Sequence, residues 1–363
     1  MSDPSKQLQD DLSASVIRAL ESKRPLLTHL NADTTWLLQI PYPAGSSPSI
    51  HRRYFNVLID PWLVGPQSDV ARWFSQQWHS TDSSVKSIKE IEELVREVAL
   101  LAEKTSTKPQ IRKRRKHSPA DKQSLIDAVV ISHEFTDHCH KDTLMEIDQD
   151  VPVFATTKAA DLIRSWKHFS TVQDTPSFTG GDWRDTSLKP LPNWIGIARL
   201  TSNSDALYYH SAILITFDSD AATGLPKKRR PTAEAIIYTP HGINAEDIRV
   251  IPAADPPIRT VAFLHGLHDV SIGRQQQLNL GAHNGLKAQR LLEAKYWVGT
   301  HDEIKQGGGI ISFFLRRRVL TLQEALENEK GENDGLVADT SDLADIKDVR
   351  FAELGNGESL VLE

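Results

Sequence analysis

The stretch from Asp127 to Leu144, DAVVISHEFTDHCHKDTL, limits what this chain can fold into more than any other part of the sequence. Residues 127–132 form a short run of apolar and β-branched residues, which is typical of a buried strand. The polarity then changes, and three histidines and two acidic residues follow within eight positions. They are His133, Glu134, Asp137, His138 and His140. Neutral imidazole and ionised carboxylate are ligands that divalent metal ions prefer, so the stretch predicts a metal-binding loop; a polar loop with solvated histidines is the alternative.

Length and composition place few limits on function. With 363 residues, the chain is long enough for one large domain or two. Its net charge of −6 gives no reason to expect nucleic acid or an anionic membrane as partner. The single cysteine, Cys139, excludes an intramolecular disulfide. The sequence has no apolar signal core and no apolar run near the ~20 residues of a membrane span, so we expect a cytoplasmic protein with a small-molecule substrate.

Three more strand-like apolar runs end in histidine. They are 235–240 before His241, 260–264 before His265 and His268, and 295–300 before His301. One histidine at a strand end carries little information, because such a side chain is usually satisfied by its neighbours or solvated. Strand patterns also alternate with helical spacing of apolar residues at 84–104 and 284–293, which predicts an α/β fold.

The loop after the predicted strand at 127–132 resembles the metal-binding loop of the metallo-β-lactamase fold superfamily. In that superfamily, His-x-His-x-Asp-His follows a strand directly. This sequence has His133-Glu-Phe135-Thr-Asp137-His138, so three of the four ligand positions match. The second histidine is replaced by Phe135, which cannot bind a metal.

A second resemblance concerns residues 54–63. A strand followed by Asp60-Pro61-Trp62-Leu63 is similar to the opening of the branch that contains ascorbate-6-phosphate lactonase and N-acyl-phosphatidylethanolamine phospholipase D. In that branch the aspartate supports the metal loop from behind the ligands. The resemblance implies this role for Asp60; a simple Asx-Pro turn is the alternative.

The resemblance implies a fold and a division of the chain. We expect a four-layer αββα sandwich over residues 25–325, after an N-terminal helical extension at 1–24. Residues 66–125 are expected to form a helical insertion next to the mouth of the site. The acidic tail 326–363 is expected to be non-catalytic, with a possible short strand near its end.

The insertion contains a basic run, Arg112–Lys116. Such a run is compatible with a phosphate-binding patch, with a nuclear localisation signal, or with a solvated loop. If it is a localisation signal, the nucleus replaces the cytoplasm as the expected location.

The resemblance also brings the histidine-bearing strand ends to one edge of the sandwich. One metal position of the family uses the first two loop histidines and a third from the middle of the chain. Here only His133 remains for it, because Phe135 replaces the second and residues 199–205 contain no histidine. His210 is a nearby candidate, but its place in an apolar strand makes a structural role as reasonable.

The other metal position of the family uses Asp137, His138 and His301, and all three are present. His241 stands where the family has an aspartate that bridges two metals, so it can add a fourth ligand to a single ion. We therefore expect a mononuclear site, with His133 as a further candidate ligand. Zinc is the first choice of metal, and iron, manganese and nickel are compatible with the same donors.

The implied activity is the metal-dependent hydrolysis of a small ester, lactone or phosphodiester by a metal-activated water. Asp137 or Glu134 is the candidate general base. His268 is a candidate to protonate the leaving group and His265 to contact the substrate, unless both belong to a polar loop under the site. A non-hydrolytic iron or redox enzyme and a catalytically degenerate ligand-binding protein are the alternatives.

Overall fold

The computed structural model describes residues 13–19, 21–43, 52–69, 71–105, 124–201, 209–218, 232–273, 276–334 and 349–363. The basic run Arg112–Lys116 lies outside these residues. Within them, no helix is both long and apolar enough to cross a membrane.

The first of two large sheets has the strand order β18-β1-β2-β3-β5-β6-β7. Its strands are β1 (Leu26–His29), β2 (Trp36–Pro41), β3 (Tyr54–Ile59), β5 (Ala128–Ile131), β6 (Val153–Ala155), β7 (Val172–Asp174) and β18 (Ser359–Val361). Strands β3, β5, β6 and β7 pair in parallel, so the loops that follow them leave the sheet at the same edge. The predicted metal-binding loop follows β5 at this edge.

The second sheet has the order β17-β14-β11-β10-β9-β8. Its strands are β8 (Ile195–Thr201), β9 (Ser211–Asp218), β10 (Ala233–Thr239), β11 (Ile258–His265), β14 (Tyr296–Val298) and β17 (Phe351–Ala352). Strands β10, β11 and β14 are parallel neighbours, so their carboxyl ends, at or after which His241, His265 and His301 lie, also meet at one edge.

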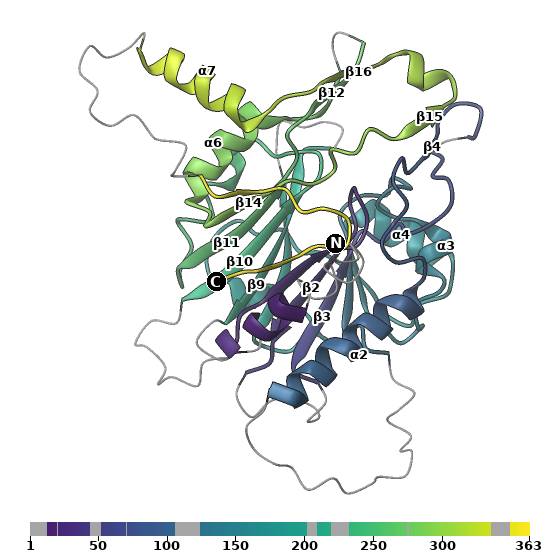
Figure 1. Cartoon of the computed structure of the whole chain (residues 1–363), viewed down its shortest axis with the longest axis vertical. Helices are drawn as coiled ribbons and strands as arrows, with labels where there is room; N and C mark the ends of the chain where they lie inside the picture. The colour runs from purple at the N-terminus through teal and green to yellow at the C-terminus, as the bar shows by residue number, and fades with distance from the viewer. Residues whose placement is uncertain are drawn as a thin grey trace, which may run out of the picture.

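Helices cover the outer face of each sheet (Figure 1). Helices α2 (Ile88–Thr105), α3 (Lys141–Leu144) and α4 (Thr157–Ser165) belong with the first sheet, and α6 (Ala282–Leu292) and α7 (Leu322–Asp334) with the second. The sequence predicted four layers of this kind, αββα, and the structure confirms them.

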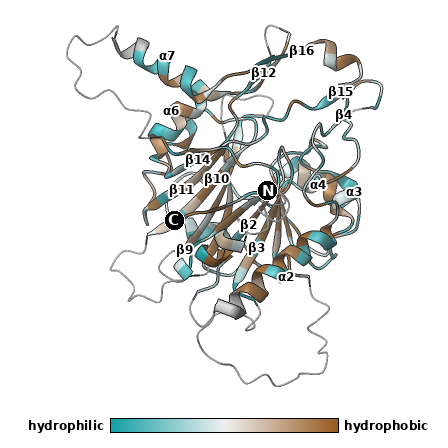
Figure 2. Cartoon of the chain, in the orientation of Figure 1, coloured by the Kyte–Doolittle hydropathy of each residue, from teal (hydrophilic) through white to brown (hydrophobic). Residues whose placement is uncertain are grey.

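Three apolar layers hold these elements together. Strand β5 shows how one strand serves two of them: Val130 packs between the sheets, whereas Val129 and Ile131 pack under the helices of the first sheet. Because both faces of such a strand are buried, its sequence is continuously apolar. Figure 2 shows mostly hydrophobic strands and a mixture of hydrophobic and hydrophilic residues on α2.

Two small sheets lie beside these layers. One has the order β13-β12-β16, with β12 (Asp269–Ile272), β13 (Gln276–Asn279) and β16 (Leu315–Arg318); the other pairs β4 (Gln76–Trp78) with β15 (Gln306–Gly308). Short 3₁₀ helices lie at Trp183–Thr186, Ala245–Ile248 and Ile310–Phe313.

The expected insertion, 66–125, divides into two parts in the structure. The predicted amphipathic helix is α2, which packs on the outer face of the first sheet. Residues 67–69 instead lie against the predicted metal-binding loop, where Asp69 accepts a hydrogen bond from the Thr136 backbone (2.9 Å) and Gln67 one from the Thr136 hydroxyl (2.7 Å). The end of the chain also joins the sandwich, since β17 pairs with β14 and β18 with β1. The domain limits at 24, 66, 125 and 325 stay predictions.

The packing of α2 can be tested with one buried and one exposed position. Ile91 is 0% exposed, whereas Leu100 on the same helix is 56% exposed. We expect Ile91→Ala to lower the free energy of unfolding by about 2–5 kcal/mol, because it leaves a cavity in the core. Leu100→Ala should change it by less than about 0.5 kcal/mol. Urea unfolding followed by circular dichroism measures both, and equal effects would contradict the packing described.

A buried carboxylate before β5 predicts a pH dependence of stability. Asp127 accepts hydrogen bonds from the Asn56 backbone (2.8 Å) and Arg52 (2.7 Å). Burial raises the pKa of Asp127 from an ordinary 3.8 to about 6, although Arg52 acts in the opposite direction. The folded protein therefore binds more protons than the unfolded chain between these values, and stability falls as the pH rises through them.

The variant Asp127→Asn lacks this ionisation and isolates its effect. Relative to the variant, the wild type should lose about 1.4 kcal/mol of stability per unit of pKa difference as the pH rises from about 4 to about 6. Urea unfolding of both proteins at several pH values measures the difference, and a constant difference across this range would rule out the raised pKa.

Candidate metal centre

Three buried histidines from different strands come together at one edge of the sandwich. His138 follows β5, His241 follows β10 and His301 follows β14. Their ring centroids lie 5.0 Å (His138–His241), 5.0 Å (His138–His301) and 5.1 Å (His241–His301) apart. The cluster exists because parallel strands in facing sheets deliver these loops to a common edge.

The Nδ1 atom of each ring in this cluster forms a hydrogen bond with an oxygen atom. The partners are Asp60 Oδ2 for His138 (2.8 Å), Asn279 Oδ1 for His241 (3.0 Å) and Asp33 Oδ1 for His301 (3.0 Å). A carboxylate or amide oxygen only accepts, so each Nδ1 carries a hydrogen and donates it. In the neutral tautomer, each Nε2 then presents a lone pair, which is how metal-binding histidines are oriented in proteins.

The Nε2 atoms of His138 and His241 lie only 3.1 Å apart. Two lone pairs repel at this distance unless a cation lies between the rings or one ring is protonated. Burial, together with charge on neighbouring histidines, lowers the pKa of His241 well below its ordinary value, and burial also lowers that of His301. Both rings are therefore neutral, the form that binds a metal.

His138 differs from the other two. Burial acts to lower its pKa, but the carboxylates of Asp137 and Asp60 outweigh burial and raise it. Without a metal, a proton on His138 Nε2 can be donated to His241. With a metal, the same negative surroundings stabilise the ion. Ligand atoms of His138, His241 and His301 lie within 4.8 Å of one another, so the donor set fits a single ion.

Asp137 provides a carboxylate beside the three rings. Its Oδ1 lies 3.7 Å from His138 Nε2, and its Oδ2 lies 4.0 Å from His301 Nε2 and 2.7 Å from the ammonium of Lys305. Burial acts to raise the pKa of Asp137, but Lys305 and the two histidines hold it well below its ordinary value. Asp137 is therefore ionised and can serve as an oxygen ligand or as a base.

Asp60 lies directly behind His138. Its buried carboxylate also accepts hydrogen bonds from the Ser132 backbone (2.7 Å), from the Ser132 hydroxyl and from Tyr238 (2.8 Å). Its backbone has a φ of 42°, a left-handed conformation that aspartate tolerates better than most residues. Asp60 thus connects β3, β5 and β10 through one side chain.

His133 is near the cluster but faces another partner. Its ring stacks on Phe135, with the centroids 5.2 Å apart and the planes at 7°, and its Nε2 lies 3.0 Å from the Tyr209 carbonyl oxygen. Its Nδ1 lies 3.6 Å from Glu134, and despite burial this contact lowers the pKa of Glu134 to about 2. Phe135 therefore holds His133 in a stacked arrangement.

The structure does not bring His265 and His268 into the cluster. His265 is held by the Gly266 carbonyl (2.6 Å) and Asn284 (3.2 Å), and His268 by Arg317 (3.0 Å). In the described part of the chain, neither has a hydrogen bond or ring contact with the three clustered histidines. For His265 the reason is strand alternation: its ring packs near Phe263, on the helix-covered face of β11.

Sequence reasoning missed four residues that hold the centre. They are Asp33, Tyr238, Asn279 and Lys305. Asp33 lies between β1 and β2, and Asn279 ends β13, so no local spacing links either to a histidine. Lys305 and Tyr238 are the exceptions, since Lys305 follows His301 by four residues and Tyr238 precedes His241 by three. Nearness to a predicted ligand was the signal available for these two.

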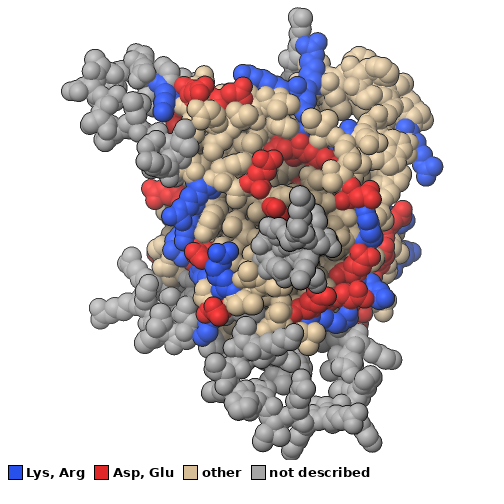
Figure 3. Space-filling view, in the orientation of Figure 1, with Lys and Arg blue, Asp and Glu red and all other residues tan. Residues whose placement is uncertain are grey.

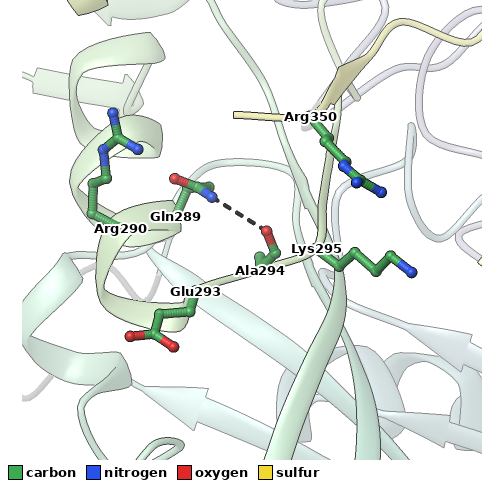
Figure 4. A pocket seen from close by; sticks show the side chains of 6 residues that line it. All are labelled: Gln289, Arg290, Glu293, Ala294, Lys295 and Arg350. Atoms are coloured by element: carbon green, nitrogen blue, oxygen red, sulfur yellow. Dashed lines mark hydrogen bonds between the residues drawn. The ribbon is translucent and has the colours of Figure 1, made fainter. Parts of the chain in front are cut away.

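A surface pocket lies at the opposite edge of the second sheet (Figure 4). It is lined by Gln289, Arg290, Glu293, Ala294, Lys295 and Arg350. Lys295 directly precedes β14, whereas His301 follows that strand, so the pocket is separate from the histidines. In Figure 4 the side chains of Lys295 and Arg350 point away from Gln289 and do not converge on one point.

Comparison with known proteins identifies the fold. No family model and no curated protein matches the sequence. Among solved structures, a possible metal-dependent hydrolase from Veillonella parvula DSM 2008 is similar, with a TM-score of 0.53 and 12% identity over 93% of this chain and 100% of that one. At this identity the similarity concerns the fold alone.

Two further structures are similar at lower scores. An isothiocyanate hydrolase from Delia radicum gut bacteria has a TM-score of 0.47 and 14% identity, covering 93% of this chain and 99% of that one. YhfI of Bacillus subtilis, a metallo-β-lactamase fold protein, has a TM-score of 0.42 and 11% identity with the same coverage. The described strands and helices form an αββα sandwich, and the similarity to the Veillonella parvula structure agrees with this fold class. The branch that the sequence suggested stays a prediction.

The orienting role of Asp60 can be tested by Asp60→Asn. The amide keeps the size of the side chain but removes its charge, and its NH2 group cannot accept the hydrogen bonds that the carboxylate accepts. Loss of such a partner typically weakens metal binding 10–100-fold, and we expect a decrease in this range. Competition with a zinc-binding dye measures the affinity. Asp161→Asn, at an exposed position of α4, is the control, and equal affinities of both variants would refute this role.

Proposed function

We propose that this protein is a metal-dependent hydrolase with one divalent ion bound by His138, His241, His301 and Asp137. The observation that carries the proposal is the orientation of the three rings. Each Nδ1 donates to an oxygen, so three Nε2 lone pairs face one another beside an ionised carboxylate. Without a cation the lone pairs and the carboxylate repel one another, whereas a bound cation stabilises the arrangement.

The donor set favours zinc. Three imidazole nitrogens and one carboxylate oxygen suit zinc, and iron(II), manganese and nickel accept similar donors. The stacking of His133 on Phe135 supports a single ion, because it directs His133 Nε2 to the Tyr209 carbonyl. His133 is accordingly a less suitable ligand than the sequence suggested.

When bound, a divalent ion supplies Lewis acidity, which polarises a carbonyl or phosphoryl oxygen and acidifies a water molecule. The protein side chains supply a base and hold the histidine rings in place. Asp137 is held ionised by Lys305, so it can accept a proton from an attacking water. Asp33, Asp60 and Asn279 hold the rings in fixed tautomers, so the site needs little reorganisation during reaction.

The proposed substrate is a small ester, lactone or phosphodiester, as the resemblance of the sequence implies. The face drawn in Figure 3 carries positive and negative side chains in mixed groups. A large basic field of the kind that binds nucleic acid is absent from the described residues on that face, which agrees with a small-molecule substrate.

Metal analysis tests the proposal directly. The purified protein should contain about one zinc ion per chain, and both zinc and the hydrolysis of nitrophenyl esters or phosphodiesters should disappear after chelation. Added zinc should restore activity. Bound iron with oxygen consumption would instead support a redox enzyme, and a folded protein that binds no metal would refute both.

The ligands are tested by His241→Ala and His301→Ala. Each removes one Nε2 donor, so we expect metal content and hydrolysis to fall at least tenfold. His168→Gln is the matched control, because His168 contacts the Ile147 carbonyl (2.8 Å) outside the cluster, and it should keep its metal. Unchanged metal content in His301→Ala would show that the assigned ligands are wrong.

A further inference from the structure

A buried lysine lies beside the proposed metal centre. The side chain of Lys305 is 6% exposed, and its Nζ lies 2.7 Å from Asp137 Oδ2 and 2.8 Å from Asp33 Oδ2. The ammonium also lies 5.4 Å from the centroid of the Trp62 ring, at a distance suited to a cation–π contact. A lysine is rarely buried to this extent unless it compensates negative charge.

The same place could accept a metal ion by composition alone. Ligand atoms of Asp33, Asp137 and His301 lie within 4.8 Å of one another, which makes a second cluster next to the three histidines. Two features argue against an ion there. The Nδ1 of His301 already donates to Asp33, and the Lys305 ammonium contacts both carboxylates.

The charges of the contacting groups lead to the same conclusion. In the described part of the chain, three carboxylates contact the histidine cluster or Lys305: Asp33, Asp60 and Asp137. Together they carry three negative charges, and Lys305 compensates one. The remaining two match one divalent ion, whereas two divalent ions in addition to Lys305 would leave excess positive charge in a buried site.

We propose that Lys305 is a fixed second cation of this centre: its ammonium fills the Asp33–Asp137 cluster, excludes a second metal ion and positions the Asp137 carboxylate. This proposal rests on the proposed metal centre. Lys305 engages Asp137 Oδ2, which leaves Oδ1 facing His138 Nε2 at 3.7 Å. Lys305 is thus a positioning residue that makes Asp137 a one-oxygen ligand.

The contacts of Lys305 agree with a permanent charge. Its ammonium, the ordinary form of a lysine at neutral pH, makes two ion pairs in a buried place. A metal ion that entered its place would have to displace a charged group with two ion pairs.

The number of bound ions tests the proposal. Wild-type protein, Lys305→Met and the double variant Lys305→Met/Asp33→Asn are stripped of metal and dialysed against excess zinc, and zinc per chain is then measured. Wild type should bind one ion. Lys305→Met should bind two, because the carboxylates of Asp33 and Asp137 are released. The double variant should return to one, because it lacks an essential oxygen ligand of the second cluster.

The outcomes separate this proposal from the proposed function. Two ions in wild type, or one ion in a folded Lys305→Met, would overturn the role of Lys305 and leave the hydrolase in place. No ion in wild type would overturn the metal centre and this proposal with it. If Lys305→Met does not fold, the wild-type stoichiometry decides: one ion supports the proposal and two refute it.

Discussion

The carboxylate of Asp60 is the contact on which the centre and the two sheets both depend. It is buried at the end of β3 and binds the backbone and hydroxyl of Ser132, the hydroxyl of Tyr238 and the ring of His138. A buried carboxylate is costly unless hydrogen bonds replace its water, and these four bonds do so. Since they come from both sheets, the charge that orients a ligand also fixes how the sheets meet.

Negative charge concentrated behind histidines is the reason to expect a cation in this centre. Asp33, Asp60 and Asp137 lie close to one another in a region that excludes water, and the orientation of the rings leaves the Nε2 atoms of His138 and His241 in contact. Proteins tolerate such clusters when a lysine, a proton or a metal ion compensates them. Here Lys305 provides part of the compensation, and the remainder is the physical basis for proposing one divalent ion.

Phe135 has a structural role beside the centre. The Phe135 ring stacks on His133 and lies 5.3 Å from Tyr209 and 5.9 Å from His241, so aromatic rings form one side of the centre. Phe135 cannot bind a metal itself, and its stacking fixes the orientation of the His133 ring.

The sequence by itself predicted the layers and, through its resemblance to a known metal loop, the candidate ligands. Runs such as 127–132 predict buried strands, and the resemblance implied that the histidines after these strands lie at one edge of the sandwich. That reasoning applied to His138, His241 and His301, and the structure brings them together. It gave the same expectation for His265, which strand alternation instead places under α6.

Only the tertiary structure decided which other groups complete the centre. Asp33, Asn279 and Lys305 come from separate loops, and their contacts depend on how the sheets and their connections pack. Periodicity describes which face of one element is buried, but not which side chains of distant elements meet across it. The candidate ligands could therefore be predicted from strand patterns and the resemblance, whereas the oxygens that orient the rings and the ammonium beside them could not.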